Sequence, residues 1–158
     1  MRPLAVGNPA PPFALTLKPG EAPLRLADYR GEKPVVLIFF PLAFSSVCTT
    51  ELRQAAQDYA SWKELGTEII GISVDSPFVN QKFAEECEAP FPIVSDFNRT
   101  AVTAYGVRND DFFGMEGVSN RAAFVVDREG IVVYSWMSED ASVLPDFPAI
   151  REAVKACR

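Results

Sequence analysis

A buried-strand pattern that gives way to a helical pattern constrains this chain more than any other feature. Residues 34–40 are almost wholly apolar and rich in β-branched and aromatic side chains, as is typical of a central strand covered on both faces. From Cys48 onward apolar residues recur at steps of three and four, which predicts a helix from about Val47 to Leu65, ended by Gly66. Cys48 therefore falls in the first turn of a helix that follows a buried strand.

The remaining patterns alternate between strands and helices. They predict a three-layer α/β fold with a mixed central sheet, helices on both faces and an N-terminal β-hairpin, in one domain spanning residues 1–158. The expected further strands are residues 13–17, 24–26, 68–74 and 93–94, with a hairpin of 122–126 and 131–136; the expected further helices are 78–87, 99–105 and 148–156.

Composition and charge exclude several classes of protein. The chain is 48% hydrophobic and 23% charged, which is ordinary for a globular protein. A net charge of −6 argues against nucleic acid or an anionic membrane as partner, since both attract basic surfaces. No apolar run approaches the ~20 residues that span a bilayer, and the first residues lead into no signal-peptide core. We therefore expect a cytoplasmic protein.

Cys48 is the candidate reagent. The thiolate is the reactive form of cysteine, and the N-terminus of a helix and a neighbouring cation both favour an anion. Ser45 and Ser46 are good N-cap residues directly ahead of the helix. Because the chain contains no histidine, the cation must be Arg or Lys, and Arg121 at the mouth of a predicted strand is the best candidate. The alternatives are that Cys48 is a small buried hydrophobe and Arg121 a surface residue.

These residues resemble the active site of the peroxiredoxins. The family signature is Pro, three residues, Thr or Ser, two residues and Cys; Pro41, Ser45 and Cys48 match it, and Arg121 would be the distant active-site arginine. Ser45 replaces the commoner Thr. The resemblance covers nearly the whole chain, and residues 39–44 and 104–107 look most like the one-Cys AhpE type. Cys87 falls in a region where some relatives of the PrxQ type carry a resolving cysteine.

The resemblance implies a thioredoxin-like fold and a thiol-dependent peroxidase that reduces hydrogen peroxide and organic hydroperoxides. Cys48 would attack the peroxide and become a sulfenic acid. The hydroxyl of Ser45, the backbone N–H groups of Val47 and Cys48, and Arg121 would stabilise the departing oxygen. Pro41 would shield the thiolate from water.

Glu51, one helical turn after Cys48, is a supporting candidate. It lies on the same side of the helix and would hold Arg121 by a bidentate pair. Its alternative explanation is simpler, because the helix dipole alone favours a Glu in a first turn.

Two further cysteines bear on how the cycle closes. Our preferred interpretation is a one-Cys cycle, in which thioredoxin, a glutaredoxin-like protein or a small thiol reduces Cys48. Cys87 is the alternative resolving cysteine, although its spacing from Phe83 also fits a buried helix face. Cys157 continues an apolar helix face and is the weaker candidate. We expect no cofactor, and no metal site, because histidine and paired ligand spacing are lacking.

Self-association and other classes of function complete the hypotheses. Peroxiredoxins are typically dimers or larger, and the apolar loop 112–115 together with Phe44 is a candidate patch for a homodimer. The same residues would also suit a redox sensor that passes its oxidation to a partner protein. A thioredoxin-fold binding module without chemistry would leave the spacing of Pro41, Ser45 and Cys48 unexplained.

Overall fold

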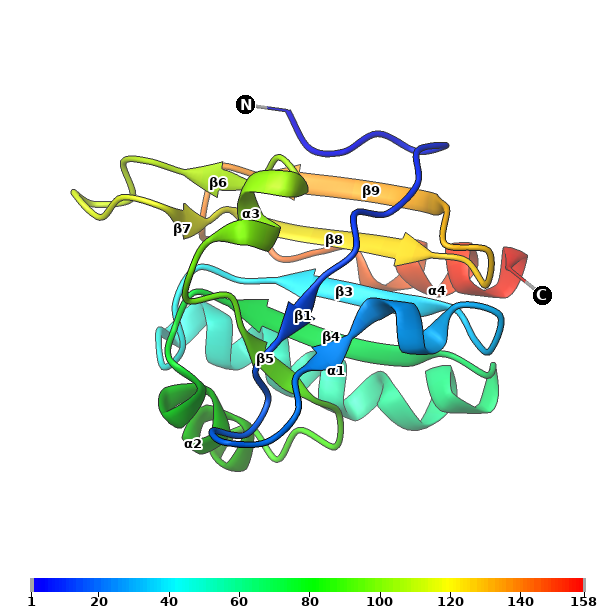
Figure 1. Ribbon diagram of the computed structural model, residues 1–158, viewed down its shortest axis with the longest axis horizontal. Helices are drawn as coiled ribbons and strands as arrows, with labels where there is room; N and C mark the ends of the chain where they lie inside the picture. The colour runs from blue at the N-terminus through cyan, green and yellow to red at the C-terminus, as the bar shows by residue number, and fades with distance from the viewer. Residues whose placement is uncertain (1, 158) are drawn as a thin grey trace.

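A five-stranded mixed sheet lies at the centre of the computed structural model, which describes residues 2–157 (Figure 1). The three strands β3, β4 and β5 are parallel, and β8 and β9 are antiparallel to their neighbours. The spatial order is β5 (Ile93–Ser95), β4 (Glu68–Ser73), β3 (Val35–Phe39), β8 (Arg121–Val126) and β9 (Val132–Ser138). The predicted fold class, with its mixed sheet and terminal hairpin, is confirmed.

The central strand β3 is buried along its whole length, as its apolar sequence predicts. Leu37 pairs with Ile70 of β4 on one side and with Phe124 of β8 on the other. Successive residues of a strand point to opposite faces, so Val36 and Ile38 pack into one core layer and their neighbours into the other. Both layers consist mainly of aliphatic and aromatic side chains.

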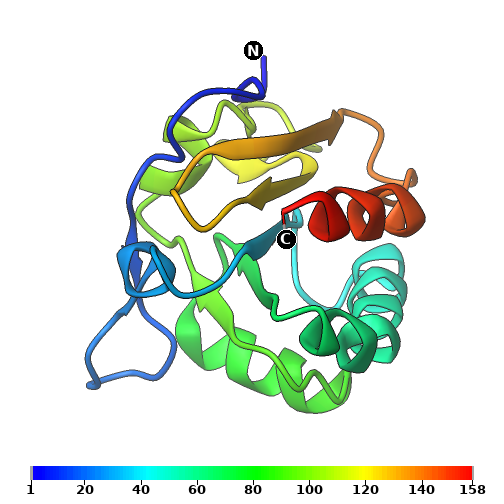
Figure 2. The same ribbon diagram turned by 90° about the vertical axis from the view of Figure 1, so that its right-hand side faces the viewer.

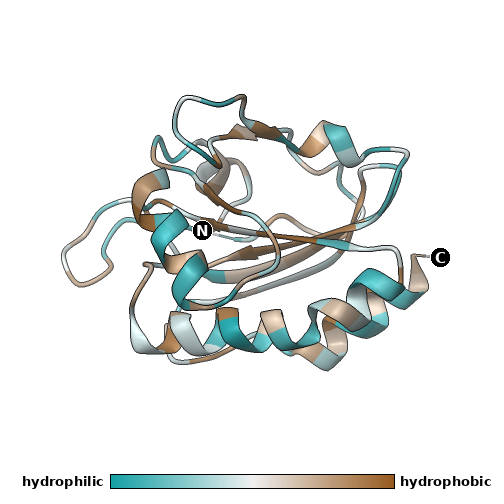
Figure 3. Cartoon of the chain, turned by 90° about the horizontal axis from the view of Figure 1, so that it is seen from below, coloured by the Kyte–Doolittle hydropathy of each residue, from teal (hydrophilic) through white to brown (hydrophobic). Residues whose placement is uncertain are grey.

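Helices cover both faces of this sheet (Figures 1 and 2). One core layer contains residues of α1, α2 and α4. The other contains residues of α3, of the short 3-10 helix η1 and of the N-terminal hairpin. The bounds are α1 (Ser46–Glu64), α2 (Pro77–Glu86), α4 (Phe147–Ala156), α3 (Thr100–Ala104), η1 (Leu26–Tyr29), β1 (Ala14–Leu15) and β2 (Leu24–Arg25). Figure 3 shows the same layering, with hydrophobic strands inside and helices that alternate between polar and apolar residues.

One pair of strands was not predicted from the sequence. β6 (Arg108–Asn109) and β7 (Val118–Ser119) form a two-residue antiparallel ladder that carries the loop 112–115, which is a loop as predicted. Two residues are too few to produce an alternating pattern, so no periodicity analysis would identify them. The other elements lie within about two residues of their predicted bounds, the usual uncertainty at element ends.

The sheet brings two distant segments to one edge. β3 and β8 run antiparallel, and Phe39 at the end of β3 pairs with Ala122 near the start of β8. The loop that follows β3 and the first residue of β8, Arg121, therefore meet at this edge. Within residues 2–157 no helix is long and apolar enough to cross a membrane.

Candidate active site around Cys48

The loop after β3 delivers Cys48 to the start of α1. Cys48 is the third residue of α1, and its side chain is fully buried. Its position in the first turn places it beside backbone N–H groups that have no partner within the helix, where the macrodipole favours negative charge. The predicted strand, turn and helix start are therefore all present.

Ser45 occupies the N-cap position of α1, but its side chain does not cap the helix. Its hydroxyl is exposed and donates to the carbonyl oxygen of Leu42 at 3.1 Å. The predicted capping bond from this side chain is wrong, because the hydroxyl turns back into the loop. In doing so it closes a short turn directly ahead of the cysteine.

Arg121 joins three segments of the chain through its guanidinium. Nη2 donates to the sulfur of Cys48 at 3.2 Å, and Nη1 donates to Oε1 of Glu51 at 2.8 Å. Nε donates to the carbonyl oxygen of Ala141, in the loop between β9 and α4, at 2.9 Å. The arginine is only 1% exposed, so it is a buried cation with a defined orientation and not a surface residue.

Glu51 is buried beside Arg121 but not in the expected geometry. Only Oε1 contacts the guanidinium, and Oε2 has no hydrogen-bond partner among the described residues. The predicted bidentate pair is therefore wrong. Burial raises the pKa of Glu51 from 4.5 to about 7, although the charge and hydrogen bond of Arg121 act in the opposite direction. The protonation of Glu51 thus changes near neutral pH, and with it the charge beside Arg121.

Pro41 and Val47 flank this cluster. Pro41 is buried in the loop, and Val47 is partly buried in the first turn of α1. A proline lacks a backbone N–H, so its burial leaves no donor without a partner.

Asp75 is a site residue that the sequence interpretation missed. Its Oδ2 accepts hydrogen bonds from the backbone N–H of Ala43 at 2.7 Å and from the hydroxyl of Ser73 at 2.8 Å. The same hydroxyl oxygen lies 3.1 Å from Oδ1 of Asn80 of α2, so the loop before Cys48 is tied to the end of β4 and lies beside α2. Asp75 directly follows β4, at the strand-end position where functional groups gather in open sheets, and that signal could have identified it.

Phe44 adds backbone strain to the same loop. Its φ of 68° lies in the left-handed region, which is unfavourable for a residue with a large side chain. Its half-exposed ring packs edge-on against Phe83 of α2, with ring centroids 5.2 Å apart. Strained residues persist where the surroundings fix them, and they concentrate at functional sites.

Neither of the other two cysteines hydrogen-bonds to Arg121 within residues 2–157. Cys87 follows α2, is 3% exposed and lies in the same core layer as Cys48, and burial raises the pKa of its thiol. Burial also raises the pKa of Cys157, which follows α4. Cys157 lines a hollow with Asp127 and Glu129, which follow β8, whereas Arg121 begins that strand. It therefore lies toward the opposite end of the sheet.

The cluster as a whole is arranged for nucleophilic chemistry. It combines a sulfur, a guanidinium that favours the anionic form of that sulfur, and a carboxylate that holds the guanidinium. Among residues 2–157, no three Cys, Asp or Glu side chains gather closely enough to hold a metal ion. The guanidinium can also donate hydrogen bonds to an oxygen that becomes negatively charged during a reaction.

Comparisons with known proteins agree on one family. The model of the AhpC/TSA family matches residues 6–135. Alkyl hydroperoxide reductase E of Mycobacterium tuberculosis is 36% identical over 142 residues, covering 89% of this chain and 90% of that protein. A chloroplastic 2-cysteine peroxiredoxin of Chattonella marina var. antiqua is 36% identical over 141 residues, covering 84% of this chain and 70% of that protein.

Solved structures show the same fold. Peroxidoxin BcpB from Mycobacterium tuberculosis superposes with a TM-score of 0.83 at 28% identity, covering 97% of each chain. A peroxiredoxin-like protein from Aquifex aeolicus superposes with a TM-score of 0.87 at 24% identity, covering all of this chain and 90% of that one. At such low identity the second comparison concerns the fold alone.

Proposed function

The chain belongs to the AhpC/TSA family of peroxiredoxins, which are thiol-dependent peroxidases, and we propose that Cys48 is its peroxidatic cysteine. The observation that carries this assignment is the 3.2 Å contact between the guanidinium of Arg121 and the sulfur of Cys48. Burying an arginine removes its hydration and costs free energy unless its partners offset that cost. The contact with the sulfur therefore supports a site that uses a sulfur anion.

The reaction follows from this pair. The thiolate of Cys48 attacks the distal oxygen of a hydroperoxide, the O–O bond breaks, and the sulfur becomes a sulfenic acid. The second oxygen leaves with the bonding electrons and takes up a proton to give water or an alcohol. Arg121 stabilises the thiolate first and then the negative charge that develops on the departing oxygen. The backbone N–H groups of Val47 and Cys48 supply further donors.

Substrate entry requires a movement of the loop before α1. The sulfur is fully covered, and buried Pro41 is part of that loop. The hydrogen bond from Ala43 to Asp75 and the packing of the Phe44 ring against Phe83 hold the loop in its covering position. An outward movement of residues 41–45 admits the peroxide, and the closed position excludes bulk water from the thiolate.

The cycle closes by the one-Cys route in this proposal. Its support is the state of the other thiols: Cys87 is buried with a raised pKa, and Cys157 lies toward the far end of β8. An external thiol attacks the sulfenic acid, releases water and forms a mixed disulfide, which a second thiol reduces to regenerate Cys48. Cys87 as a resolving cysteine is the competing scheme, since relatives include both AhpE and 2-cysteine peroxiredoxins.

Self-association is part of the same proposal. Phe113 is 87% exposed, and Met115 and Phe44 are 40% and 49% exposed. Large apolar side chains at such exposure are typical of surfaces that a partner covers, and a second copy of the chain is the partner we propose. A Phe113→Ser variant that shifts the oligomeric mass in light scattering supports this, whereas an unshifted mass contradicts it.

The decisive experiment follows the oxidation of Cys48 directly. One equivalent of hydrogen peroxide should convert Cys48 to a sulfenic acid that dimedone traps, as peptide mapping by mass spectrometry shows. Cys48→Ser should consume no peroxide, while Cys157→Ser serves as the matched control and should retain activity. Full activity of Cys48→Ser would refute the assignment. Oxidation without turnover in the presence of thioredoxin, a glutaredoxin and small thiols would instead indicate a redox sensor.

A further inference from the structure

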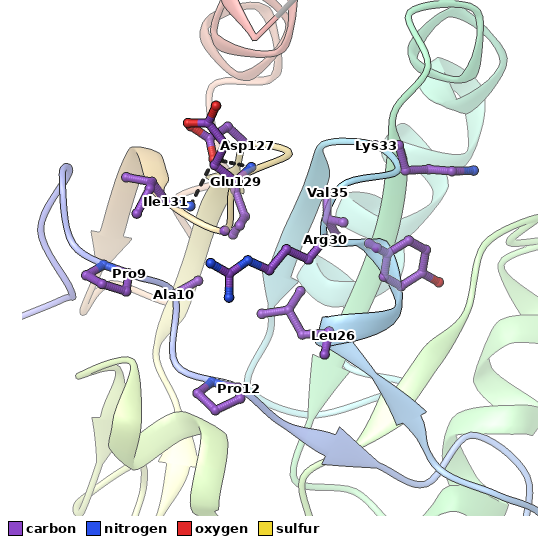
Figure 4. Close-up of a pocket in the computed structure, with 14 residues that line it drawn as sticks. Pro9, Ala10, Pro12, Leu26, Arg30, Lys33, Val35, Asp127, Glu129 and Ile131 are labelled. Carbon is purple, nitrogen blue, oxygen red and sulfur yellow. Dashed lines mark hydrogen bonds between the residues drawn. The ribbon is translucent and has the colours of Figure 1, made fainter.

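A cavity lies at the end of the sheet opposite Cys48. It has a volume of about 320 Å³ and is bounded by the N-terminal segment, by the region around η1 and by the turn between β8 and β9 (Figure 4). Val126 lines it, and Arg121 begins the same strand. At ~3.3 Å per residue, the five steps along β8 separate the two residues by roughly 17 Å. The cavity is therefore distinct from the site around Cys48.

The walls of this cavity are apolar and fixed in place. Leu26 and Val126 extend into the cavity wall from the hydrophobic core, and Pro9 and Ala10 form the facing wall. The N-terminal segment is held by hydrogen bonds from Ala10 to the carbonyl of Gly130 and from Gly7 to that of Val132, at 2.8 Å each. A preformed apolar cavity of this size is at the small end of ligand-binding sites.

Arg30, an exposed residue, reaches from the surface into the opening of this cavity, and its guanidinium has no partner among residues 2–157. Figure 4 shows the side chain of Arg30 reaching between Ala10 and Leu26. Its Nε and Cδ lie close to Gly130, at 3.7 and 3.8 Å from the position that a Cβ would occupy there. Within residues 2–157 this guanidinium makes no ion pair, and its side chain has no hydrogen bond. Lys33 also lines the cavity.

Two acidic residues at the rim leave this guanidinium unpaired. Oδ1 of Asp127 accepts the backbone N–H groups of Glu129 and Ile131, at 2.9 Å each, and so closes the turn between β8 and β9. Glu129 is exposed to solvent. Neither carboxylate is within ion-pair distance of Arg30. The charged group that reaches between the apolar walls is therefore a cation.

We propose that this cavity binds a small organic carboxylate with an apolar body. The apolar walls would take up the body of the ligand, and Arg30 would bind the carboxylate through the paired N–H groups that suit a carboxylate geometrically. Lys33 adds positive charge at the rim. An inorganic anion would make no contact with the apolar walls. A cation with an apolar body would be repelled by the positive charge of Arg30. The site does not depend on the chemistry of Cys48.

Octanoate is a suitable probe, with octylammonium as the probe of reversed charge. Calorimetric titration of the full chain up to roughly 10 mM octanoate should show saturable binding, and octylammonium should show none. Amide shifts in NMR should map the octanoate to Ala10, Leu26, Arg30 and residues 126–131. Absence of saturable octanoate binding, equal binding of octylammonium, or shifts confined to residues 44–51 would overturn the proposal.

Arg30→Met tests the named contact, because methionine keeps an unbranched apolar side chain and removes the charge. Loss of a charge-assisted hydrogen bond should weaken octanoate binding by about tenfold or more. Arg25→Met is the matched control, since Arg25 is an exposed residue of β2 that does not line the cavity, and it should bind like the wild type. Wild-type affinity in folded Arg30→Met would overturn the proposal. Circular dichroism of both variants confirms that they are folded.

Discussion

Replacing Arg121 with glutamine removes the cation that contacts the sulfur of Cys48. Glutamine keeps a polar side chain but cannot reach all three partners of the guanidinium, namely Cys48, Glu51 and the carbonyl of Ala141. The substitution therefore separates the electrostatic contribution of the arginine from the intrinsic reactivity of the thiol. We expect the oxidation of Cys48 by hydrogen peroxide to become much slower at neutral pH.

The size of the effect follows from the geometry. A full positive and a full negative charge 3.2 Å apart interact with about 5 kcal/mol at an effective dielectric constant of 20, which is an upper bound for one contact. Oε1 of Glu51 accepts a hydrogen bond from the same guanidinium at 2.8 Å, and this reduces the net stabilisation that Arg121 gives to the sulfur anion. Removing one oriented donor from a comparable site costs about 100- to 1,000-fold in rate, which lies within this bound. We expect a decrease of that order.

The assay measures a single turnover. Reduced protein is mixed with a small excess of hydrogen peroxide, quenched with dimedone at increasing times, and the sulfenic acid adduct is measured by intact mass. Arg121→Lys retains the charge but not the three-way contact and should lie between the wild type and Arg121→Gln. Arg151→Gln is the matched control, because Arg151 is exposed on α4, and it should react at the wild-type rate.

A result that contradicts this reasoning is easily recognised. If folded Arg121→Gln reacts within about threefold of the wild type at pH 7, the guanidinium does not supply the expected stabilisation. The single variant leaves Glu51 buried without its partner, so we expect it to lose stability. The double variant Arg121→Gln with Glu51→Gln removes both charges together. The double variant should be as slow as Arg121→Gln, and a near-wild-type rate in it would also refute the argument.

Three further predictions concern neighbouring groups. The pKa of Glu51 is raised to about 7, so the folded state retains a proton that the unfolded state releases, and stability falls as pH rises from 4.5 to 7. The test measures the free energy of unfolding in urea for two proteins that both carry Cys48→Ser, one with Glu51 and one with Glu51→Gln. Between pH 4.5 and 7 the protein with Glu51 should lose up to roughly 3 kcal/mol of unfolding free energy relative to the other, and a constant difference would contradict the raised pKa. Asp75→Ala removes the acceptor for the N–H of Ala43, so hydrogen exchange in the loop before Cys48 should accelerate by about tenfold or more, and unchanged exchange would exclude the anchor. Cys87→Ser should turn over within about twofold of the wild type with a small-thiol reductant, whereas loss of turnover, or a Cys48–Cys87 disulfide found by peptide mapping of the oxidised wild type, would establish a resolving role for Cys87.

The parts of the fold that the sequence predicted are those with a strong repeating pattern. The buried strand at residues 34–40 and the helix that begins near Cys48 are long enough for their periods to be recognised. The two-residue strands β6 and β7 contain no period, and only the three-dimensional arrangement creates them. The sequence bounds of the longer helices and strands could therefore be predicted, but those of β6 and β7 could not.

Some features of the candidate site could be predicted from the sequence and others could not. The spacing of Pro41, Ser45 and Cys48 and an arginine at the start of a predicted strand could be recognised because they are local or chemically unusual. The contact of Arg121 with the carbonyl of Ala141 could not, since any residue type presents a carbonyl. The hydroxyl of Ser45 turns toward Leu42, and one oxygen of Glu51 stays without a partner, because loop packing and not residue type decides these orientations.

The carbonyl of Ala141 gives the site a dependence on the order of synthesis. The ribosome synthesises Cys48 first and Arg121 later. Ala141, whose carbonyl oxygen orients the guanidinium, is synthesised only after β9. A nascent chain that ends with β9 contains Cys48 and Arg121, yet it lacks the bond that fixes the guanidinium. We therefore expect the guanidinium of Arg121 to reach its final orientation only after residue 141 has been synthesised.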